Sequence, residues 1–433
     1  MKKCSIGSRM YALAGELFPV CRSITGEGIR FTLKRFQEEV PEIILHEVPC
    51  GTKVFDWIIP KEWKIEEAYI EDSKGNRIVD FQKNNLHVMG YSIPVDEIVS
   101  LEKLNEHIYS LPDHPDWIPY VTSYYKERWG FCMSHNQRLS LNKDDYHVVI
   151  KSELFNGSLT YAELLIPGRS EKEIFLSTYV CHPSMANNEL SGPIVQLELA
   201  KWLLQRPERK YSYRLIWIPE TIGSITYLSK NLDIMKKNII AGYNITCVGD
   251  DRVVSYISSK KKNTLADIAA KNILHFIAPQ FIEYDFLHRG SDERQYNAPG
   301  VDLPVCSVCR SKYHEYPEYH TSADDMSMIS PSGLEKAYEI YKEIIDALEY
   351  NTKYKVNCFC EPQLGQRGLY PTESFNRSSI SVQDMMNFIA YADGNLDLFE
   401  ISEIIDVPVK KLHEIAVKLE KEKLLTEVNK NDL

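Results

Sequence analysis

The middle of the chain alternates short apolar runs with longer amphipathic segments, and this alternation limits the fold more than any other feature. The apolar runs between residues 150 and 350 are 173–180, 213–218, 239–248 and 303–308. The segments that separate them, and the closing segment 332–350, repeat their apolar residues at helical spacing. Strands that alternate with helices predict an α/β fold, with a mostly parallel sheet covered by helices on both faces.

The flanking regions predict additional domains, as a chain of 433 residues requires. Residues 53–150 contain short β-type runs and many aromatic residues, which predicts an inserted β-rich domain. Three amphipathic segments with tight turns predict a winged helix over residues 379–433, after a linker at 355–378. We therefore assign residues 1–52 and 151–355 to the α/β domain.

Charge and cysteine usage exclude several classes of protein. The formal net charge is -11, so the whole chain should be repelled by phosphate backbones and anionic lipid. No apolar run reaches the roughly 18 to 20 residues that a membrane-spanning helix needs. The ten cysteines are scattered and do not form a disulfide pattern, which indicates a reducing compartment. We expect a cytoplasmic protein without a membrane partner.

The predicted winged helix is acidic. Residues 381–433 contain six lysine and arginine residues against eleven aspartate and glutamate residues. A winged helix that reads DNA normally carries a basic face, so we expect no nucleic-acid partner. Contact with another protein, including a second copy of this chain, is the favoured role, and gene regulation is the alternative.

Polar side chains follow successive predicted strands. His182, Glu220 and Asp250 come just after the first three apolar runs, and His320 lies in a loop before the last helix. The carboxyl ends of parallel strands meet at one edge of a sheet, where ligands bind in α/β proteins. Zinc favours nitrogen and oxygen ligands of this kind. The pattern predicts a metal centre near the two histidines, although each residue alone also has a structural interpretation, such as a helix-end charge for Glu220.

The order of these residues resembles that of zinc-dependent aminopeptidases of the bacterial leucyl aminopeptidase and glutamate carboxypeptidase type. Over nearly all of its length, the chain more closely resembles a bacterial family of polysaccharide-biosynthesis proteins with an aminopeptidase-like domain, a β-rich insert and a C-terminal winged helix. The segments that carry this resemblance are HPSMANNELSG, IPETIGS, RGSDERQY and YPEYHTSADDM. The resemblance implies a zinc-aminopeptidase-like three-layer sandwich.

The resemblance also implies roles for individual residues. His182 and His320 match the first and last metal ligands, and Glu220 matches the general base. Arg289 and Arg294 flank a segment near the peptidase site, where they could hold a substrate carboxylate. They could equally form surface salt bridges, and the sequence leaves both roles open.

The chain departs from the peptidase pattern at several carboxylates. The bridging aspartate falls on Asn188, so the adjacent Glu189 is the candidate carboxylate ligand, with Asp250 as a further candidate. Neutral residues also stand where the peptidases have three other carboxylates, namely at Ser184, Thr221 and Thr246. These departures indicate one zinc ion rather than two.

Two functions therefore remain. The first is a zinc-dependent aminopeptidase-like hydrolase that cleaves an amide bond in a peptide or a surface-polysaccharide-related substrate. The second is a catalytically degenerate protein that uses the same pocket for binding or scaffolding. Zinc content distinguishes them, because the hydrolase requires about one tightly held ion per chain.

Overall fold

The computed structural model of the chain describes residues 5–369 and 382–428, and these form two compact units. The first unit comprises the residues up to Ala266 together with Ile282–Tyr338. The second comprises Asp267–Phe281 and the residues from Glu339 onward. Residues 370–378 of the predicted linker, and the two ends of the predicted winged helix at 379–381 and 429–433, lie outside the described residues.

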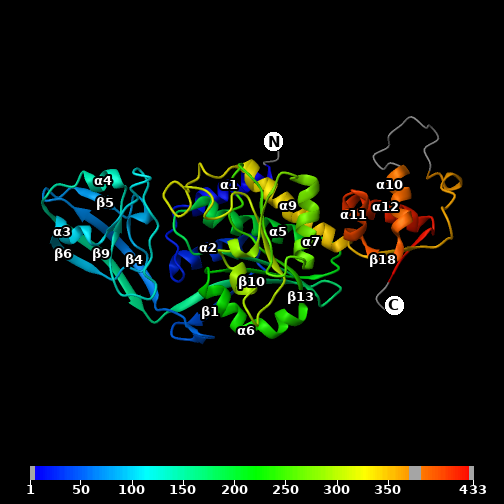
Figure 1. The fold of residues 1–433 in the computed structure, drawn as a ribbon. Helices are drawn as coiled ribbons and strands as arrows, with labels where there is room; N and C mark the ends of the chain where they lie inside the picture. The colour runs from blue at the N-terminus through cyan, green and yellow to red at the C-terminus, as the bar shows by residue number, and fades with distance from the viewer. Residues whose placement is uncertain (1–4, 370–381, 429–433) are drawn as a thin grey trace. The chain divides into compact units, whose positions relative to one another are not determined.

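An eight-stranded sheet forms the centre of the first unit (Figure 1). Its order is β1-β10-β12-β11-β13-β16-β14-β15, and the four strands from β12 to β16 in this order are mutually parallel. These four are β12 (Ser212–Ile218), β11 (Glu173–Tyr179), β13 (Ile239–Asn244) and β16 (Val305–Cys309). The edge strands are β1 (Ile44–Pro49), β10 (Ser158–Ile166), β14 (Ser255–Ile257) and β15 (Ile282–Tyr284). The predicted α/β fold with a mostly parallel sheet is confirmed.

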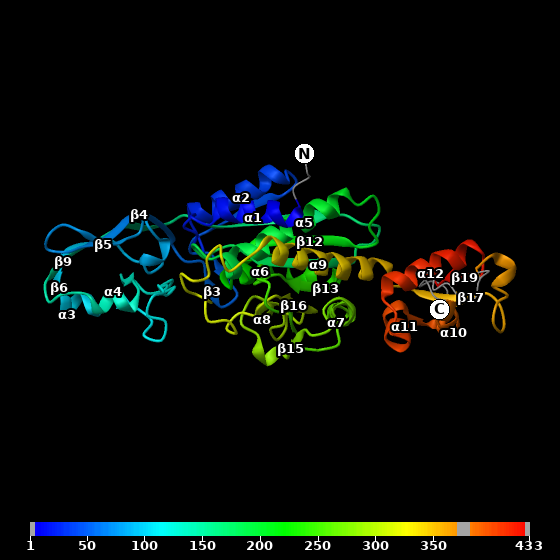
Figure 2. The same ribbon diagram turned by 90° about the horizontal axis from the view of Figure 1, so that it is seen from above.

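Helices cover both faces of this sheet because side chains alternate along the buried strands. On β12, the Trp217 ring packs against Phe36 and donates its indole N–H to the Pro193 carbonyl. The neighbours Ile216 and Ile218 join the apolar cluster of the opposite face. Figure 1 shows α1 and α2 above the sheet and α6 below it, and Figure 2 shows the same elements turned by 90°. The helices of the two faces include α1 (Ile6–Leu17), α2 (Glu27–Glu39), α5 (Ser191–Gln205) and α6 (Ile222–Asn238).

A second, antiparallel sheet lies between β1 and β10 in the sequence. Its order is β5-β4-β9-β6, and its last strand in sequence, β9, leads into β10 through a turn at Gly157. A short hairpin of β2 (Lys53–Val54) and β3 (Trp57–Ile58) precedes this sheet. Its strands are β4 (Glu62–Glu71), β5 (Arg77–Asp80), β6 (Val95–Ser100) and β9 (Asp145–Phe155). These strands fall in the region for which the sequence predicts a β-rich insert.

Beyond residue 352, the described residues of the second unit form three α-helices and a small sheet of order β18-β17-β19. The sequence predicts a turn at 393–395, but these residues belong to β18, whose residue Asp393 pairs with Lys355 of β17. The elements are β17 (Lys353–Val356), α10 (Val382–Tyr391), β18 (Asp393–Asp397), α11 (Leu398–Ile405), α12 (Val409–Lys421) and β19 (Leu425–Glu427).

Two further long helices are α7 (Leu265–Ile277) and α9 (Pro331–Tyr350), and three short ones are α3 (Leu101–Asn105), α4 (His135–Leu139) and α8 (Glu293–Tyr296). Within residues 5–369 and 382–428, none of the helices has the length and apolar character needed to cross a bilayer.

Candidate metal centre

The first histidine lies in a segment whose backbone is fixed by a buried carboxylate. After β11, the chain forms a π-helical turn, Ala186–Leu190, which leads directly into α5. Both oxygens of Asp324 accept backbone N–H groups from this turn, at 2.6 Å from Asn187 and 2.9 Å from Asn188. Burial raises the pKa of Asp324 to about 6. Turns of this type often occur at functional sites.

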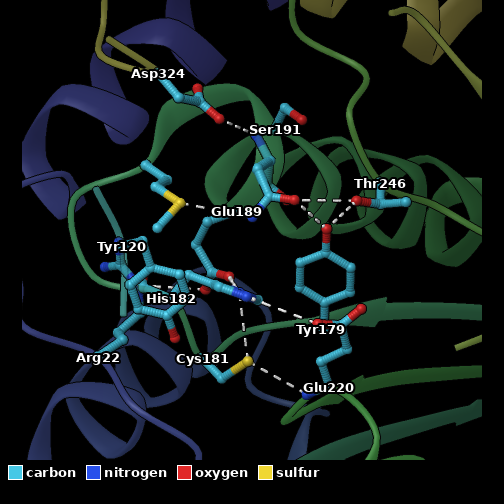
Figure 3. Close-up of polar contacts among 12 residues, drawn as sticks. Arg22, Tyr120, Tyr179, Cys181, His182, Glu189, Ser191, Glu220, Thr246 and Asp324 are labelled. Atoms are coloured by element: carbon cyan, nitrogen blue, oxygen red, sulfur yellow. Dashed lines mark hydrogen bonds and ion pairs between the residues drawn. The ribbon is translucent and has the colours of Figure 1, made fainter. Parts of the chain in front are cut away.

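His182 lies between two carboxylates (Figure 3). Its Nδ1 is 2.9 Å from Glu189 Oε2, and its Nε2 is 3.6 Å from Glu220 Oε2. Burial alone lowers the pKa of His182, but the neighbouring Cys181 and Glu189 outweigh it and hold that pKa well above the usual value. Because Nδ1 is bonded to Glu189, Nε2 is the nitrogen that remains for a ligand. A carboxylate on one nitrogen commonly orients a histidine for a metal on the other.

Arg22 neutralises the carboxylate that holds His182. Its Nε is 3.3 Å from Glu189 Oε1 and donates to the His182 carbonyl at 3.0 Å. Its Nη1 donates to the Leu17 carbonyl at 2.8 Å. Both charged side chains are fully buried. From the sequence, residues 21–28 form a turn between two helices, which gives no sign that Arg22 contacts Glu189.

His320 brings a second imidazole to the same place. The centroid of its ring is 5.2 Å from that of His182, and the edge of Tyr120 contacts both rings. Its Nε2 is buried and has no hydrogen-bond partner among the described residues. Burial and the neighbouring His182 hold the pKa of His320 well below the usual value, so the ring is neutral. A neutral imidazole with a free buried nitrogen fits a metal ligand.

The inserted region positions the loop of His320. The Tyr120 N–H donates to the His320 carbonyl at 2.9 Å, and the Ser322 N–H donates to the Ile118 carbonyl at 2.8 Å. The Ile118 N–H in turn donates to Ser322 Oγ at 2.9 Å. These bonds hold His320 in a left-handed conformation with a φ of 57°, which is costly for a residue other than glycine.

Glu220 follows β12 and faces His182. Burial raises its pKa, while His182 and Arg294 oppose that rise. The next residue, Thr221, has a φ of 63° and donates its N–H to Asp292 Oδ1 at 2.8 Å. Burial and the nearby Glu220 raise the pKa of Asp292 to about 7. Asp292, which sequence reasoning did not single out, thus fixes the strained backbone beside Glu220.

Asp250 lies in a different network. Its carboxylate accepts the Ser311 N–H at 2.8 Å, the Ser311 hydroxyl at 2.9 Å and the Arg252 N–H at 2.9 Å. It is not among the residues that line the pocket of the two histidines. The structure therefore places this predicted ligand where it joins two loops, and its metal role stays a prediction.

The position of the peptidases' bridging carboxylate is occupied by a neutral network. Asn188 Oδ1 accepts the Tyr179 hydroxyl at 2.7 Å, and Thr246 Oγ1 donates to the same hydroxyl at 2.5 Å. All three side chains are buried. These groups satisfy one another and add no negative charge for a second cation.

Two groups of residues could hold a metal ion. Cys181, His182 and Glu189 have ligand atoms within 4.8 Å of one another. Burial raises the pKa of Cys181 to about 11, and the guanidinium of Arg22 lies against Glu189, so this group suits a cation poorly.

The pocket side of His182 suits a cation better. Two atoms bound to a tetrahedral zinc ion at about 2.1 Å are roughly 3.4 Å apart. The 3.6 Å between His182 Nε2 and Glu220 Oε2 is close to this spacing. His320 adds a second imidazole, so His182, Glu220 and His320 together offer the two-histidine, one-glutamate set of catalytic zinc sites.

These three residues lie at a pocket of about 390 Å³. Both the main sheet and the inserted region contribute to its walls. The other residues that line it are Ile24, Trp57, Tyr120, Thr122, Tyr124, Tyr125, Cys181, Thr221, Ile222 and Arg294.

The fold and this pocket define an aminopeptidase-like α/β protein. Its structure is similar to that of a zinc aminopeptidase from Bacillus subtilis, with a TM-score of 0.58 at 12% identity over 79% of this chain and 95% of the other. At that identity the likeness shows the fold alone. A crystal structure of a protein from Clostridium acetobutylicum, named as a peptidase, matches with a TM-score of 0.92 at 42% identity over 98% of this chain and 96% of the other.

Residues 11–351 match the family described as a domain of unknown function, DUF4910, and the chain belongs to that family. Residues 352–427 match a winged helix-turn-helix, which confirms the prediction for the C-terminal region. A relative from Clostridium acetobutylicum is named as a polysaccharide biosynthesis protein with an aminopeptidase-like domain. It is 47% identical over 365 residues, which cover 84% of this chain and 83% of the relative. These matches confirm the resemblance to polysaccharide-biosynthesis proteins with an aminopeptidase-like domain that the sequence predicts.

Proposed function

We propose that this protein is a zinc-dependent hydrolase of amide bonds that holds one zinc ion through His182 and His320. The observation that carries the proposal is the pair of imidazoles, 5.2 Å apart, with a free buried Nε2 on His320 and Glu220 facing His182. Zinc bound at such a site supplies Lewis acidity for a substrate carbonyl and makes water more acidic.

The residues of the chain prepare this site for binding and proton transfer. Glu189 accepts from Nδ1 of His182 and orients the ring, while Arg22 lies against the other oxygen of Glu189. Two features support a single ion: Glu189 is already paired with Arg22, and Asn188 carries no charge for a second cation. Aromatic side chains line much of the pocket, and their low polarity strengthens electrostatic contacts inside it.

Glu220 has two roles open to it, and one measurement separates them. As a general base it would accept a proton from water, and the pKa that burial raises suits that task. As a third ligand it would complete the metal site. The isosteric variant Glu220→Gln should retain zinc and lose turnover if Glu220 is the base, but lose both if it is a ligand.

Zinc content tests the proposal directly. Purified protein analysed by mass spectrometry of elements should contain about one zinc per chain, and His182→Ala and His320→Ala should each lose it. His288→Ala is the matched control, because His288 is exposed and its ring contacts Asp285 and Tyr284, neither of which lines the pocket. Turnover of a chromogenic amide panel should stop with chelator and return with zinc. A protein without zinc or turnover would instead support the catalytically degenerate binding or scaffold function.

A further inference from the structure

The pocket contains a fixed positive charge whose hydrogen-bonding capacity is mostly unused. Arg294 is exposed on α8 (Glu293–Tyr296) and lines the pocket of the two histidines. Its Nη2 donates to Thr221 Oγ1 at 2.7 Å. Among the described residues, no carboxylate lies within ion-pair distance of Arg294. A guanidinium has five N–H donors, so most of this fork faces the pocket or solvent without a protein acceptor.

Arg289, the second arginine of the same segment, lies in a different environment. It donates to the Phe286 carbonyl at 3.2 Å and stacks over the Phe286 ring at 4.7 Å. It does not line the pocket. Of the two arginines that could hold a substrate carboxylate, only Arg294 therefore lines the pocket.

The charges of the pocket do not suit a free amino terminus. A substrate ammonium group needs carboxylate or carbonyl acceptors, whereas Glu220 is the only carboxylate among the lining residues, and it faces His182. The charge available for recognition is the guanidinium of Arg294, which matches a carboxylate in a bidentate geometry.

An aromatic pair, Trp57 and Tyr125, also lines the pocket. Trp57 is 41% exposed and Tyr125 is 55% exposed, although large aromatic side chains usually bury more of their surface. Their rings meet edge to face with centroids 5.9 Å apart, and the Tyr125 hydroxyl donates to the Ile58 carbonyl at 3.1 Å. The pair is thus held open toward the pocket, where it offers apolar area to a planar or ring-shaped group.

We propose that the pocket takes N-acylated amino acids or the carboxyl end of a blocked peptide, with the carboxylate on Arg294 and the acyl group near Trp57 and Tyr125. This inference rests on the proposed function for the position of the amide bond. It names a substrate class in which the recognised end is a carboxylate and the amino group is acylated.

Binding to metal-free protein tests the inference separately from hydrolysis. The full chain, treated with chelator, is titrated calorimetrically with N-benzoylglycine and with its uncharged partner, N-benzoylglycinamide. Because neither zinc nor turnover is needed, a failure of the proposed hydrolase leaves this measurement intact. We expect the acid to bind at least about tenfold more tightly than the amide, as one charge-assisted bidentate contact can provide.

Three variants assign the preference to particular residues. Arg294→Gln should bring the affinity for the acid to that for the amide, and Arg289→Gln, the matched control, should leave the preference unchanged. Trp57→Ala should weaken both ligands by a similar factor. Equal affinity for acid and amide in the wild type, binding of neither ligand at millimolar concentration, or an unchanged preference in Arg294→Gln would each overturn the inference. Tighter binding of phenylalaninamide, whose amine is free, would overturn it as well.

Discussion

At the scale of single residues, the candidate site depends on a buried ion pair that no substrate touches. Arg22 and Glu189 have no exposed side-chain surface, and Glu189 also holds Nδ1 of His182. A buried charge that loses its partner is expensive, whereas loss of both charges is much cheaper. The pair therefore couples the stability of the fold to the orientation of His182.

Arg22→Met should lower the free energy of unfolding by about 3 to 5 kcal/mol, because it removes the guanidinium partner of the buried Glu189 carboxylate. The double variant Arg22→Met with Glu189→Gln should recover part of this loss. Urea unfolding followed by tryptophan fluorescence measures both, since all six tryptophans belong to the first unit. Strict additivity of the two single changes would show that the residues do not interact.

A second prediction concerns Asp324, whose pKa burial raises from 3.8 to about 6. Folding favours the protonated form, so its contribution to stability is complete below about pH 4 and is lost as the pH rises through 6. The loss should approach about 3 kcal/mol. Asp324→Asn cannot ionise, so its stability relative to wild type should improve by that amount between pH 4 and pH 8. A difference that is independent of pH would contradict this cause.

At the scale of elements, the regular elements with clear periodicity were predictable from the sequence. Strands β11 and β12 and helices α5 and α9 agree with their predicted ranges to within about two residues. Strand ends also placed His182 and Glu220 together at the pocket, whereas Asp250, predicted in the same way, does not line it. The short strand β18 was missed because its pairing with β17 depends on contacts outside any local window.

The supporting polar contacts could not be predicted in the same way. Arg22 contacts a carbonyl 160 positions later in the chain, and Asp324 caps a turn 137 positions earlier. Neither residue has a local pattern that marks it as buried. Charged residues are mostly exposed, so the sequence alone favours a surface position for both.

The start of α5 packs closely against the main sheet, so substitution by alanine should affect stability very differently at two helical glycines. A Cβ on Gly192 would lie 2.3 Å from the Ile245 carbonyl oxygen and 2.6 Å from Thr178 Oγ1. A Cβ on Gly15 in α1 would meet only Met326 Cε at 3.9 Å. Gly192→Ala should therefore cost about 3 kcal/mol through overpacking. Gly15→Ala should be neutral or stabilise by up to about 1 kcal/mol. Urea unfolding compares them, and equal effects would contradict the close approach.

At the scale of the whole molecule, the distribution of charge argues against a nucleic-acid function. The winged helix lies in the second unit, and its residues 381–433 contain more acidic than basic residues. On α12, Lys410 pairs with Glu343 at 3.0 Å and Lys411 pairs with Asp384 at 2.5 Å. Two of the cations that could contact phosphate are therefore already neutralised within the unit.

We predict that the full chain binds a 20-base-pair duplex no more tightly than about 10⁻⁴ M at physiological salt, the weak end of non-specific binding. Fluorescence anisotropy with a labelled duplex at several salt concentrations measures this. A nanomolar complex that weakens steeply with salt would instead support a regulator.

The backbone bonds between residues 118–120 and 320–322 determine whether the inserted region can be removed without loss of the site. An inserted region that makes no contact with a site can be deleted without disturbing that site. In this protein, the loop of His320 forms backbone hydrogen bonds with the inserted region, as neighbouring strands of a sheet do. Residues 118–120 thus help to fix the backbone at His320, so removal of residues 53–150 should displace this histidine.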